Sequence, residues 1–482
     1  MATDSITTPR THSHLSAIDS GLLAAVAAGH ARLTLEQGLE LLKSAPLHEL
    51  GRWADTRART VHGDTYRTYV IDRNINYTNV CSAKCIFCAF KRTARDHDAY
   101  TLEYEELYEK IGELSDIGGT QILMQGGMNP DLPLDWYLEL LHGIKERYPH
   151  IHVHGFSPPE FIEFVNFFDP PGATLADKIR WVMVRLQEAG LDSLPGGGGE
   201  IFAAPVRDKI GLGKCDAEAW LTTMYVAHSL GMYTSSTMMF GHIEGYADRI
   251  HHIGLVREWQ DRALRDFASG TEVGGKTVPG GHYKAFITWP FQRENTPLGR
   301  VRDWGMLDED LGPFPGDVVA TLAGDGDPKA HRQFGKRVRM AGATEYLRTQ
   351  AVGRLMLDNI YSIGSSWVTM GPHVGQLALF YGANDMGSVM MEENVVSSAG
   401  TTYCLDEAVL CRLIRDAGFI PAQRDNVYDI LRTHDGNAEN DANPDLAVTD
   451  WSTHRAQRLH AQSENAIPAT GKAELTVGVT DN

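Results

Sequence analysis

The hydrophobic pattern near the N-terminus predicts two helices. Thr34 and Gln37 have the spacing of a capping box, and they begin a leucine-rich segment whose apolar residues recur near the helical period. A second short helix is expected over residues 47–59. Residues 1–15 are polar and rich in Thr, Ser and His, which predicts a disordered start. Residues 16–62 therefore form a helical lead-in.

From residue 66 onward, apolar runs of strand length alternate with helical stretches. The expected strands cover residues 66–75, 120–124, 151–156, 192–194, 232–240, 284–289, 360–368 and 377–381. Eight strands separated by helices predict an α/β fold, a (β/α)8 barrel of the TIM type over residues 63–432 with a C-terminal helical extension. The active site of such a barrel forms at the C-terminal ends of its strands.

Two glycine-rich stretches interrupt this alternation. Residues 256–282 and 303–342 are expected to be long loops, and loops of this length are usually lids, partner surfaces or disorder. After a last helix at 411–417, the tail at 433–482 is polar and poor in aromatic residues. It is predicted to be disordered.

Three cysteines form the strongest chemical motif. Cys81, Cys85 and Cys88 have Cys-x3-Cys-x2-Cys spacing, which gives three thiolates to one metal centre and no obvious fourth. A cubane iron-sulfur cluster normally takes four cysteines, so three would leave one iron open. Zinc favours a second Cys-x2-Cys pair or a Cys/His set, and the sequence has no second pair. Three unrelated buried thiols are the other alternative. The remaining cysteines are scattered and fit small buried hydrophobes: Cys215, Cys404 and Cys411.

This cysteine spacing, with an aromatic residue before the last cysteine, resembles the radical SAM superfamily. The resemblance implies that Cys81, Cys85 and Cys88 hold a 4Fe-4S cluster, whose open iron chelates the amino and carboxylate groups of S-adenosyl-L-methionine (SAM). It also implies that the residues that bind SAM follow successive strands. These are Phe87, Gly126, Gly127, Ser157, Glu200 and Arg207.

The expected SAM contacts have alternative explanations in the sequence alone. Gly126 and Gly127 carry no Cβ, so their backbone could approach a ligand closely and adopt positive φ, but a plain tight turn would look the same. The resemblance implies that Glu200 and Arg207 hold the amino-acid moiety or the ribose of SAM. An Arg fork matches a carboxylate, yet an ordinary surface ion pair remains possible.

Longer segments narrow the resemblance to the dehypoxanthine futalosine cyclases of menaquinone biosynthesis, over residues 35–432. The matching segments are Asn74–Cys81, Gln125–Pro133, His152–Glu160, Thr237–His242, Ser366–Pro372 and Gly382–Val396. The resemblance implies that a 5'-deoxyadenosyl radical abstracts the ribose C4' hydrogen of dehypoxanthine futalosine, and that flavodoxin or ferredoxin donates the electron. Aminofutalosine synthase, the FO synthase subunits and a non-catalytic iron-sulfur scaffold are the alternatives.

The cyclisation also requires the loss of one proton, so a polar group near the strand ends must accept it. No spacing argument selects one base, and each candidate could equally bind ribose hydroxyls. The candidates are Asp385, Glu392, Glu393, His154 and His242. Trp289 and Trp367 could stack on adenine or on the substrate ring, or could pack in the core.

Composition limits the partners and the compartment. A net charge of -18 over 482 residues argues against nucleic acid as a partner. The six cysteines are too few for a disulfide scaffold, which favours a reducing compartment. The apolar run at residues 22–28 is too short to span a membrane, and no signal-peptide pattern precedes it. A cytoplasmic protein without membrane partners is expected.

Overall fold

The structure is a computed structural model, and it describes residues 20–300, 340–401 and 403–436. Several predictions fall on residues outside these ranges. They are the disordered start at 1–15, most of the second long loop, at 303–339, and the tail from 437 onward.

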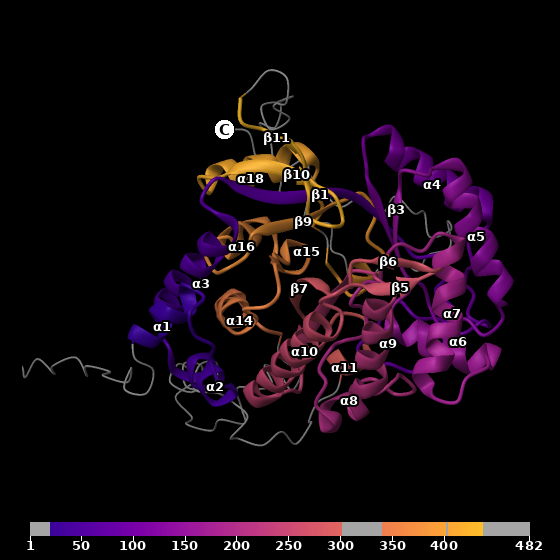
Figure 1. The fold of residues 1–482 in the computed structure, drawn as a ribbon, viewed down its shortest axis with the longest axis horizontal. Helices are drawn as coiled ribbons and strands as arrows, with labels where there is room; N and C mark the ends of the chain where they lie inside the picture. Colours follow the sequence, from indigo (N-terminus) through magenta and orange to yellow (C-terminus); the bar gives the residue numbers. More distant parts are fainter. Residues whose placement is uncertain (1–19, 301–339, 402, 437–482) are drawn as a thin grey trace, which may run out of the picture.

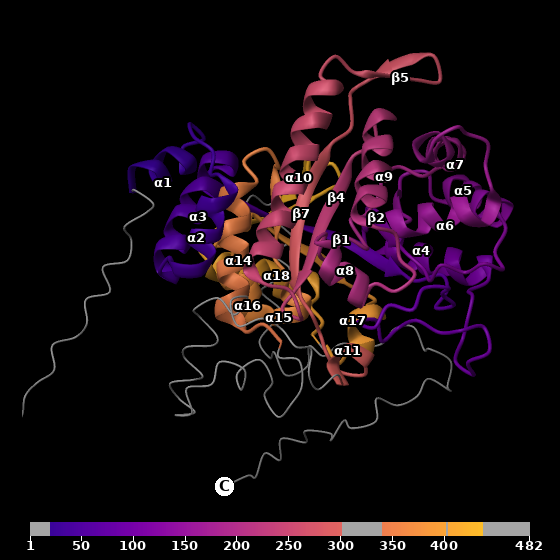
Figure 2. The same ribbon diagram turned by 90° about the horizontal axis from the view of Figure 1, so that it is seen from below.

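Three helices precede the barrel: α1 (Ser20–Ala27), α2 (Leu35–Ser44) and α3 (Leu47–His62). The predicted capping box at α2 is confirmed, because the Thr34 hydroxyl accepts from the Gln37 N–H at 3.2 Å and the Gln37 amide oxygen accepts from the Thr34 N–H at 2.9 Å. The second predicted helix is also confirmed. Helices α2 and α3 lie beside α14 (Ala343–Met356), and α1 packs on α3 (Figure 2). The Arg348 guanidinium on α14 donates to the Ala45 carbonyl at the end of α2, at 2.6 Å.

Parallel strands form the barrel wall in the order β3-β2-β1-β9-β8-β7-β4. Figure 1 labels β1, β3, β7 and β9 of this wall. They are β1 (Tyr66–Ile75), β2 (Gln121–Met124), β3 (His152–Gly155), β4 (Thr234–Phe240), β7 (Tyr283–Pro290), β8 (Ser362–Gly364) and β9 (Asp385–Met390). The predicted fourth strand is only a pair of isolated bridges, in which Ser193 pairs with His154 and Leu194 with Thr234. These bridges join β3 to β4, and the expected (β/α)8 architecture is confirmed.

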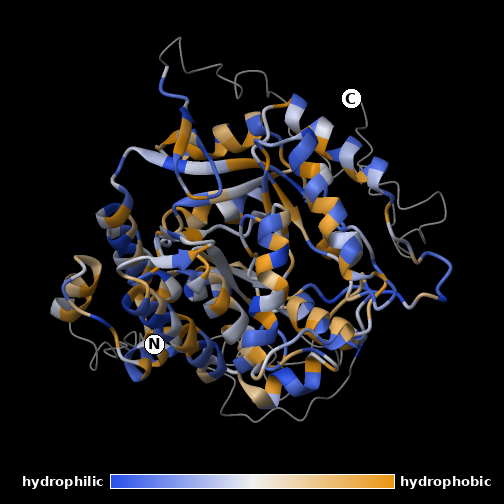
Figure 3. Cartoon of the chain, turned by 45° about the vertical axis from the view of Figure 1, so that its right-hand side comes forward, coloured by the Kyte–Doolittle hydropathy of each residue, from blue (hydrophilic) through white to orange (hydrophobic). Residues whose placement is uncertain are grey.

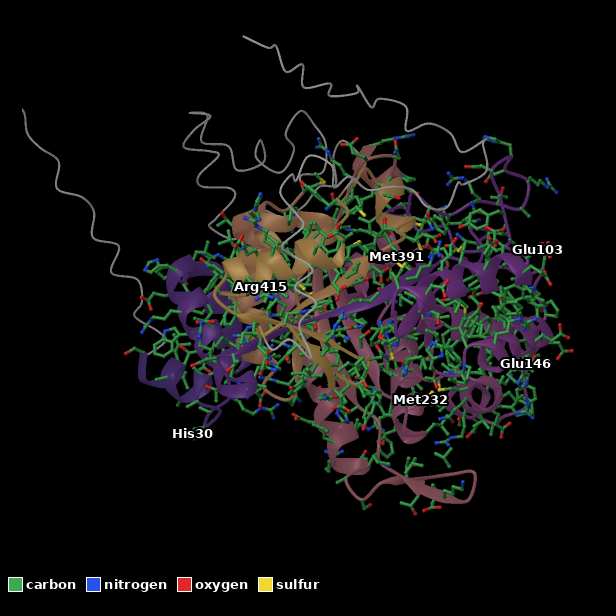
Figure 4. The ribbon with its side chains drawn as sticks, turned by 90° about the horizontal axis from the view of Figure 1, so that it is seen from above. His30, Glu103, Glu146, Met232, Met391 and Arg415 are labelled. Atoms are coloured by element: carbon green, nitrogen blue, oxygen red, sulfur yellow. The ribbon has the colours of Figure 1, made fainter. Side chains whose placement is uncertain are left out.

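Helices cover the outside of this wall. The longer ones are α4 (Tyr104–Asp116), α5 (Leu134–Arg147), α6 (Pro158–Phe168), α7 (Leu175–Ala189), α9 (Ala217–Ser229), α10 (Tyr246–Asp266) and α14. Short helices lie in the connections: α8 (Ala204–Ile210), α11 (Pro297–Arg300), α15 (Trp367–Met370), α16 (Pro372–Ala378) and α17 (Val395–Ser398). In α4 the residues Leu107, Ile111 and Leu114 are buried at helical spacing. Hydrophobic residues accordingly gather toward the sheet (Figure 3), while Glu103 and Glu146 lie at the outer rim (Figure 4).

The eighth predicted strand, at 377–381, is wrong. Leu377 and Ala378 end α16, and the eighth strand is β9 instead. The apolar run at 377–381 predicted the strand in the wrong place because β9 contains Asp385, Gly387 and Ser388. β9 therefore lacks the hydrophobicity of a buried strand. These polar residues face the barrel interior, as described below.

The first predicted long loop, at 256–282, is also wrong. Its first part is the second half of α10, and the rest contains a hairpin of β5 (Thr271–Val273) and β6 (Lys276–Val278). Gly274 and Gly275 form the hairpin turn with φ of +56° and +75°. The glycines thus mark a tight turn between short strands, which extends away from the barrel (Figure 2).

The C-terminal extension is only partly helical, which corrects the prediction. After α18 (Glu407–Asp416), the chain forms β10 (Ile420–Arg424) and β11 (Ile430–Thr433). β10 pairs in parallel with the first half of β1, while β2 pairs with its second half. The long first strand therefore carries two neighbours along one edge, and β10 brings Arg424 to the barrel interior.

In the ranges that the structure describes, no helix is both long and apolar enough to cross a membrane.

Candidate active site

The three motif cysteines lie together in the loop that follows β1. Backbone hydrogen bonds fix this loop, since the Cys81 N–H donates to the Arg92 carbonyl and the Ser82 N–H to the Met128 carbonyl, both at 2.9 Å. Cys81, Cys85 and Cys88 pack in one small apolar cluster with Ala83 and Met128. The loop thus presents three free thiols in one place.

The chemistry of these thiols fits an iron-sulfur cluster. Burial raises the pKa of Cys81 and raises that of Cys85 to about 12, so a metal must displace the thiol protons. Among the described residues, no three His, Cys, Asp or Glu side chains are arranged to hold a single metal ion. A cubane places each thiolate on a different iron, so Cys81, Cys85 and Cys88 would hold three of its four irons.

Gly126 and Gly127 support the cysteine loop sterically. Neither has positive φ, so that part of the expectation is wrong. A Cβ on Gly127 would lie 2.1 Å from the Val80 carbonyl oxygen, and a Cβ on Gly126 would lie 2.4 Å from the Tyr77 ring. Glycine is needed here because β1 and its loop pack directly against this segment.

Ser157 and Glu160 connect this region to the third strand. The Ser157 N–H and hydroxyl both donate to Glu160 Oε2, at 2.7 and 2.6 Å, in the capping box that begins α6. Glu160 Oε1 accepts from the Tyr77 hydroxyl at 2.7 Å and from the Gly126 N–H at 3.1 Å. Burial raises the pKa of Glu160. Sequence reasoning noted the segment that ends at Glu160 but gave this residue no role, although the Ser-x-x-Glu spacing is a capping-box signal.

Glu200 forms a buried ion pair with Lys214, a residue that sequence reasoning missed. The Lys214 ammonium lies 2.8 Å from Glu200 Oε1 and 5.1 Å above the centre of the Phe87 ring. Burial opposes the charge of Lys214, but Glu200 and Cys85 raise the pKa of the ammonium above its ordinary value. Glu200 Oε2 is buried without a partner, and the residue has φ of +37°. A spare carboxylate oxygen therefore lies close to the cysteine loop.

The Arg207 side chain binds the glycine loop that follows the fourth predicted strand. Its guanidinium donates to the carbonyls of Gly198 (3.0 Å), Gly199 (2.9 Å) and Cys215 (2.8 Å). Arg207 and Glu200 are 5% and 4% exposed, which excludes an ordinary surface pair between them. Arg207 thus shapes the loop beside the cysteine motif.

A cavity of about 350 Å³ occupies the barrel interior. At the C-terminal ends of the strands it reaches Gln125, Gly197 and Val396, and the opposite region is lined by Arg424 and Tyr428. The predicted aromatic residues belong to its wall, since Trp289 and Trp367 both line it. Its size falls within the usual range of small-molecule sites.

Three of the five candidate bases line this cavity: Asp385, Glu393 and His154. The Arg424 guanidinium donates two hydrogen bonds to the Asp385 carboxylate, at 2.5 and 2.9 Å. Glu393 accepts three backbone N–H groups at the start of α17, and burial raises its pKa. Burial lowers the pKa of His154 to about 3, and its Nδ1 contacts the Ser193 hydroxyl at 2.6 Å. His154 is therefore neutral near pH 7.

The other two candidates do not line the cavity. His242 is buried beside Glu244, with 3.2 Å between its Nδ1 and the carboxylate. Glu392 pairs with Arg73 at 2.9 Å and with Lys110 at 3.2 Å, beneath α4. Glu393, the next residue in the chain, lines the cavity, whereas Glu392 does not.

Sequence reasoning missed three polar residues on the cavity wall: Asp72, Asn74 and Gln121. The Asp72 carboxylate accepts from the Gln121 amide at 2.8 Å and from the Ser388 hydroxyl. Burial raises the pKa of Asp72 to about 6. Asn74 Oδ1 and Gln121 Oε1 are buried without partners. The alternation of Asp72 and Asn74 on one face of β1 was the available signal.

Structural comparison finds the same fold in enzymes of low sequence identity. Methylornithine synthase matches with a TM-score of 0.55 and 17% identity, over 83% of this chain and 97% of that one. The FeFe-hydrogenase maturase HydG from Carboxydothermus hydrogenoformans matches with a TM-score of 0.56 and 14% identity, over 85% and 80% of the two chains.

Sequence relatives match far more closely. Cyclic dehypoxanthine futalosine synthase of Halalkalibacterium halodurans is 38% identical over 83% of this chain and 92% of the relative, and that of Streptomyces coelicolor is 36% identical over 85% and 88%. Aminodeoxyfutalosine synthase of Thermus thermophilus is 32% identical over 84% and 94%.

Two family models match separate parts of the chain. The model of the radical SAM superfamily matches residues 75–256, and that of the CofH/MqnC C-terminal region matches residues 327–436. Members of this family use a 4Fe-4S cluster and SAM, in agreement with the expected cofactors. With these motifs, this fold and these relatives, the chain belongs to the radical SAM superfamily, as an enzyme of the futalosine-pathway type.

Proposed function

We propose that the protein cyclises dehypoxanthine futalosine to cyclic dehypoxanthine futalosine in menaquinone biosynthesis. The two relatives at 38% and 36% identity carry the name of this activity. The observation that carries the proposal here is the polar wall of the barrel cavity, where two buried amide oxygens lack donors and two tryptophans are present. Such a wall suits a molecule that combines ribose hydroxyls with an aromatic ring.

The orientation of these amides follows from their neighbours. The Gln121 nitrogen donates to the Asp72 carboxylate, so Gln121 Oε1 must be the atom that lacks a donor. Asn74 Oδ1 lies on the adjacent strand, two residues after Asp72. A buried acceptor without a donor is costly, and ribose hydroxyls would supply the missing donors.

Trp367 supplies a hydrogen-bond donor that complements these acceptors. Its indole N–H is buried without a partner, and the residue lines the cavity. An oxygen of the substrate, from its ketone or its carboxylate, would accept this hydrogen bond. Acceptors on β1 and β2 and a donor on α15 would then fix the orientation of the substrate within the barrel.

The cofactors fit the residues above the cavity. Cys81, Cys85 and Cys88 would hold the cluster, and Glu200 Oε2 would accept from the SAM amino group, which supplies its missing donor. When bound, the cluster and SAM supply the 5'-deoxyadenosyl radical that abstracts the C4' hydrogen. Phe87, Gly126, Gly127 and Ser157 would border SAM, and Arg207 would position the loop that carries Glu200. The surrounding barrel wall would keep solvent from the radical.

Product analysis tests the proposal. The protein, reconstituted with iron and sulfide without oxygen, is incubated with SAM and dithionite, which replaces a flavodoxin or ferredoxin donor. With dehypoxanthine futalosine, we expect 5'-deoxyadenosine and a product two hydrogens lighter than the substrate. An adduct that retains the adenosyl group, formed from an enolpyruvyl benzoate, would instead identify an aminodeoxyfutalosine synthase. Iron-sulfur absorbance without any 5'-deoxyadenosine would indicate a scaffold.

A further inference from the structure

We propose that Asp72 is the base that removes the ring proton after cyclisation, an inference that rests on the proposed function. In that reaction the C4' radical bonds to a carbon of the benzoate ring, which then carries both a hydrogen and the new bond. The C–H bond must break to restore aromaticity. Its proton goes to an Asp72 oxygen, its electron pair returns to the ring, and the one surplus electron passes to a one-electron acceptor of the iron-sulfur class.

The geometry of the cavity selects Asp72 among its carboxylates. Within the described residues, the acidic side chains on the cavity wall are Asp72, Asp385 and Glu393. The Arg424 guanidinium occupies both oxygens of Asp385, and three backbone N–H groups occupy Glu393. Protonating either carboxylate would break these contacts, which disfavours each as a proton acceptor.

Asp72 has a different set of neighbours. Its oxygens accept from one amide and one hydroxyl, on Gln121 and Ser388, and no ion pair joins Asp72 to a cation within the part of the chain that the structure describes. Both donors are uncharged, so either carboxylate oxygen can take up a proton without breaking an ion pair. A hydroxyl can also reverse its hydrogen bond and accept from a protonated carboxyl group.

The charged groups around Asp72 keep its proton affinity moderate. On β9, Asp385 raises the pKa of Asp72, and on β10 the Arg424 guanidinium lowers it, while burial has the largest effect and raises it. The β2 neighbour is the uncharged Gln121, and β3 contributes the neutral His154 to the same cavity. A base works best when its pKa lies near the working pH, and the value of about 6 meets that condition better than the value of about 3 for His154.

The Asp72→Asn variant tests the assignment. Hydrogen abstraction precedes proton loss, so this variant should still form 5'-deoxyadenosine while the cyclised product per 5'-deoxyadenosine falls about a hundredfold. Asp72→Glu should restore part of the product. The matched control is Asp116→Asn, which removes an exposed carboxylate from the end of α4 and should leave the ratio unchanged. Circular dichroism checks that each variant is folded.

The pH profile separates a base from a structural carboxylate. In the wild-type protein, product per 5'-deoxyadenosine should fall as the pH drops through about 6, because protonated Asp72 cannot accept a proton. Ser388→Ala removes a donor to the carboxylate, so the fall should move to higher pH by about half a unit to one unit. A purely structural Asp72 would not produce this shift.

The outcomes distinguish the two proposals. If the wild-type protein makes the cyclised product and Asp72→Asn retains it at the same ratio, Asp72 is not the base and the proposed function stands. An unchanged pH profile in Ser388→Ala, with active protein, would also contradict the assignment. If the wild-type protein makes no cyclised product, the proposed function and the role of Asp72 fail together.

Discussion

Side chains of similar type have very different surroundings at this site. Glu392 and Glu393 are neighbours in the sequence, yet one forms ion pairs beneath α4 and the other lies on the cavity wall. Local spacing could predict the cysteine motif, because its three thiols lie within eight residues. It could not rank the candidate bases or find Lys214, because their partners come from distant parts of the chain.

The cysteine motif gives the first prediction at this scale. Cys85→Ala removes one of the three proposed cluster ligands, so the reconstituted protein should lose its brown colour or be unable to cleave SAM. Iron content, the visible spectrum and 5'-deoxyadenosine formation measure this. Cys404→Ala is the control, because Cys404 lies outside the thiol cluster and should retain iron. Normal SAM cleavage by Cys85→Ala would contradict the assignment.

The buried pair of Glu200 and Lys214 gives a second residue-scale prediction. Lys214→Met leaves the Glu200 carboxylate buried without its cation, which should cost about 3 kcal/mol of unfolding free energy in the apoprotein. Urea unfolding measures this cost. Adding Glu200→Gln should recover most of the stability, because no unpaired charge remains.

SAM binding should respond differently from stability in the same variants. If Glu200 Oε2 accepts from the SAM amino group, the double variant should be stable but bind SAM on the order of tenfold more weakly. Equilibrium dialysis with the reconstituted protein gives the affinity. Wild-type affinity in the double variant would show that Glu200 only stabilises the loop.

At the scale of elements, the sequence predicted most of the barrel and failed at its polar strand. Seven predicted strand positions correspond to β1, β2, β3, the bridges at 193–194, β4, β7 and β8, because their apolar runs are bounded by turn signals. β9 was missed because its inward residues are polar. β10 was missed because it follows the last helix and pairs with β1, the first strand of the barrel.

The contact between the loop after β1 and the segment after β2 gives an element-scale prediction. Gly127→Ala would place a methyl group 2.1 Å from the Val80 carbonyl oxygen, and this backbone atom cannot move without shifting the cysteine loop. We expect the variant to fold but to bind clearly less iron after reconstitution. Gly342→Ala is the control, since a Cβ there meets nothing within 4 Å. Equal iron content in both variants would show that the loop tolerates the shift.

At the scale of the whole molecule, several neutral histidines are buried around the barrel. They make the stability of the folded protein sensitive to acid. Burial lowers the pKa of His154, His228 and His252 to about 3. Each binds its proton near pH 6.5 when the chain is unfolded, so the unfolded state holds more protons between about pH 6.5 and 3. The stability that these groups contribute is therefore complete above pH 6.5 and is lost as the pH falls toward 3.

This linkage gives a prediction for the protein as a whole. The unfolding free energy from urea titrations should fall below pH 6, and three fully titrating histidines would give a slope of about 4 kcal/mol per pH unit. His252 is the most suitable one to remove, because its ring is fully buried and stacks on Phe202 with 4.0 Å between the ring centres. His252→Phe should lower this slope by the contribution of about one proton, and the protein should stay folded at pH 7. An unchanged slope in this variant would show that His252 is protonated in the folded protein, or that the acid sensitivity has another origin.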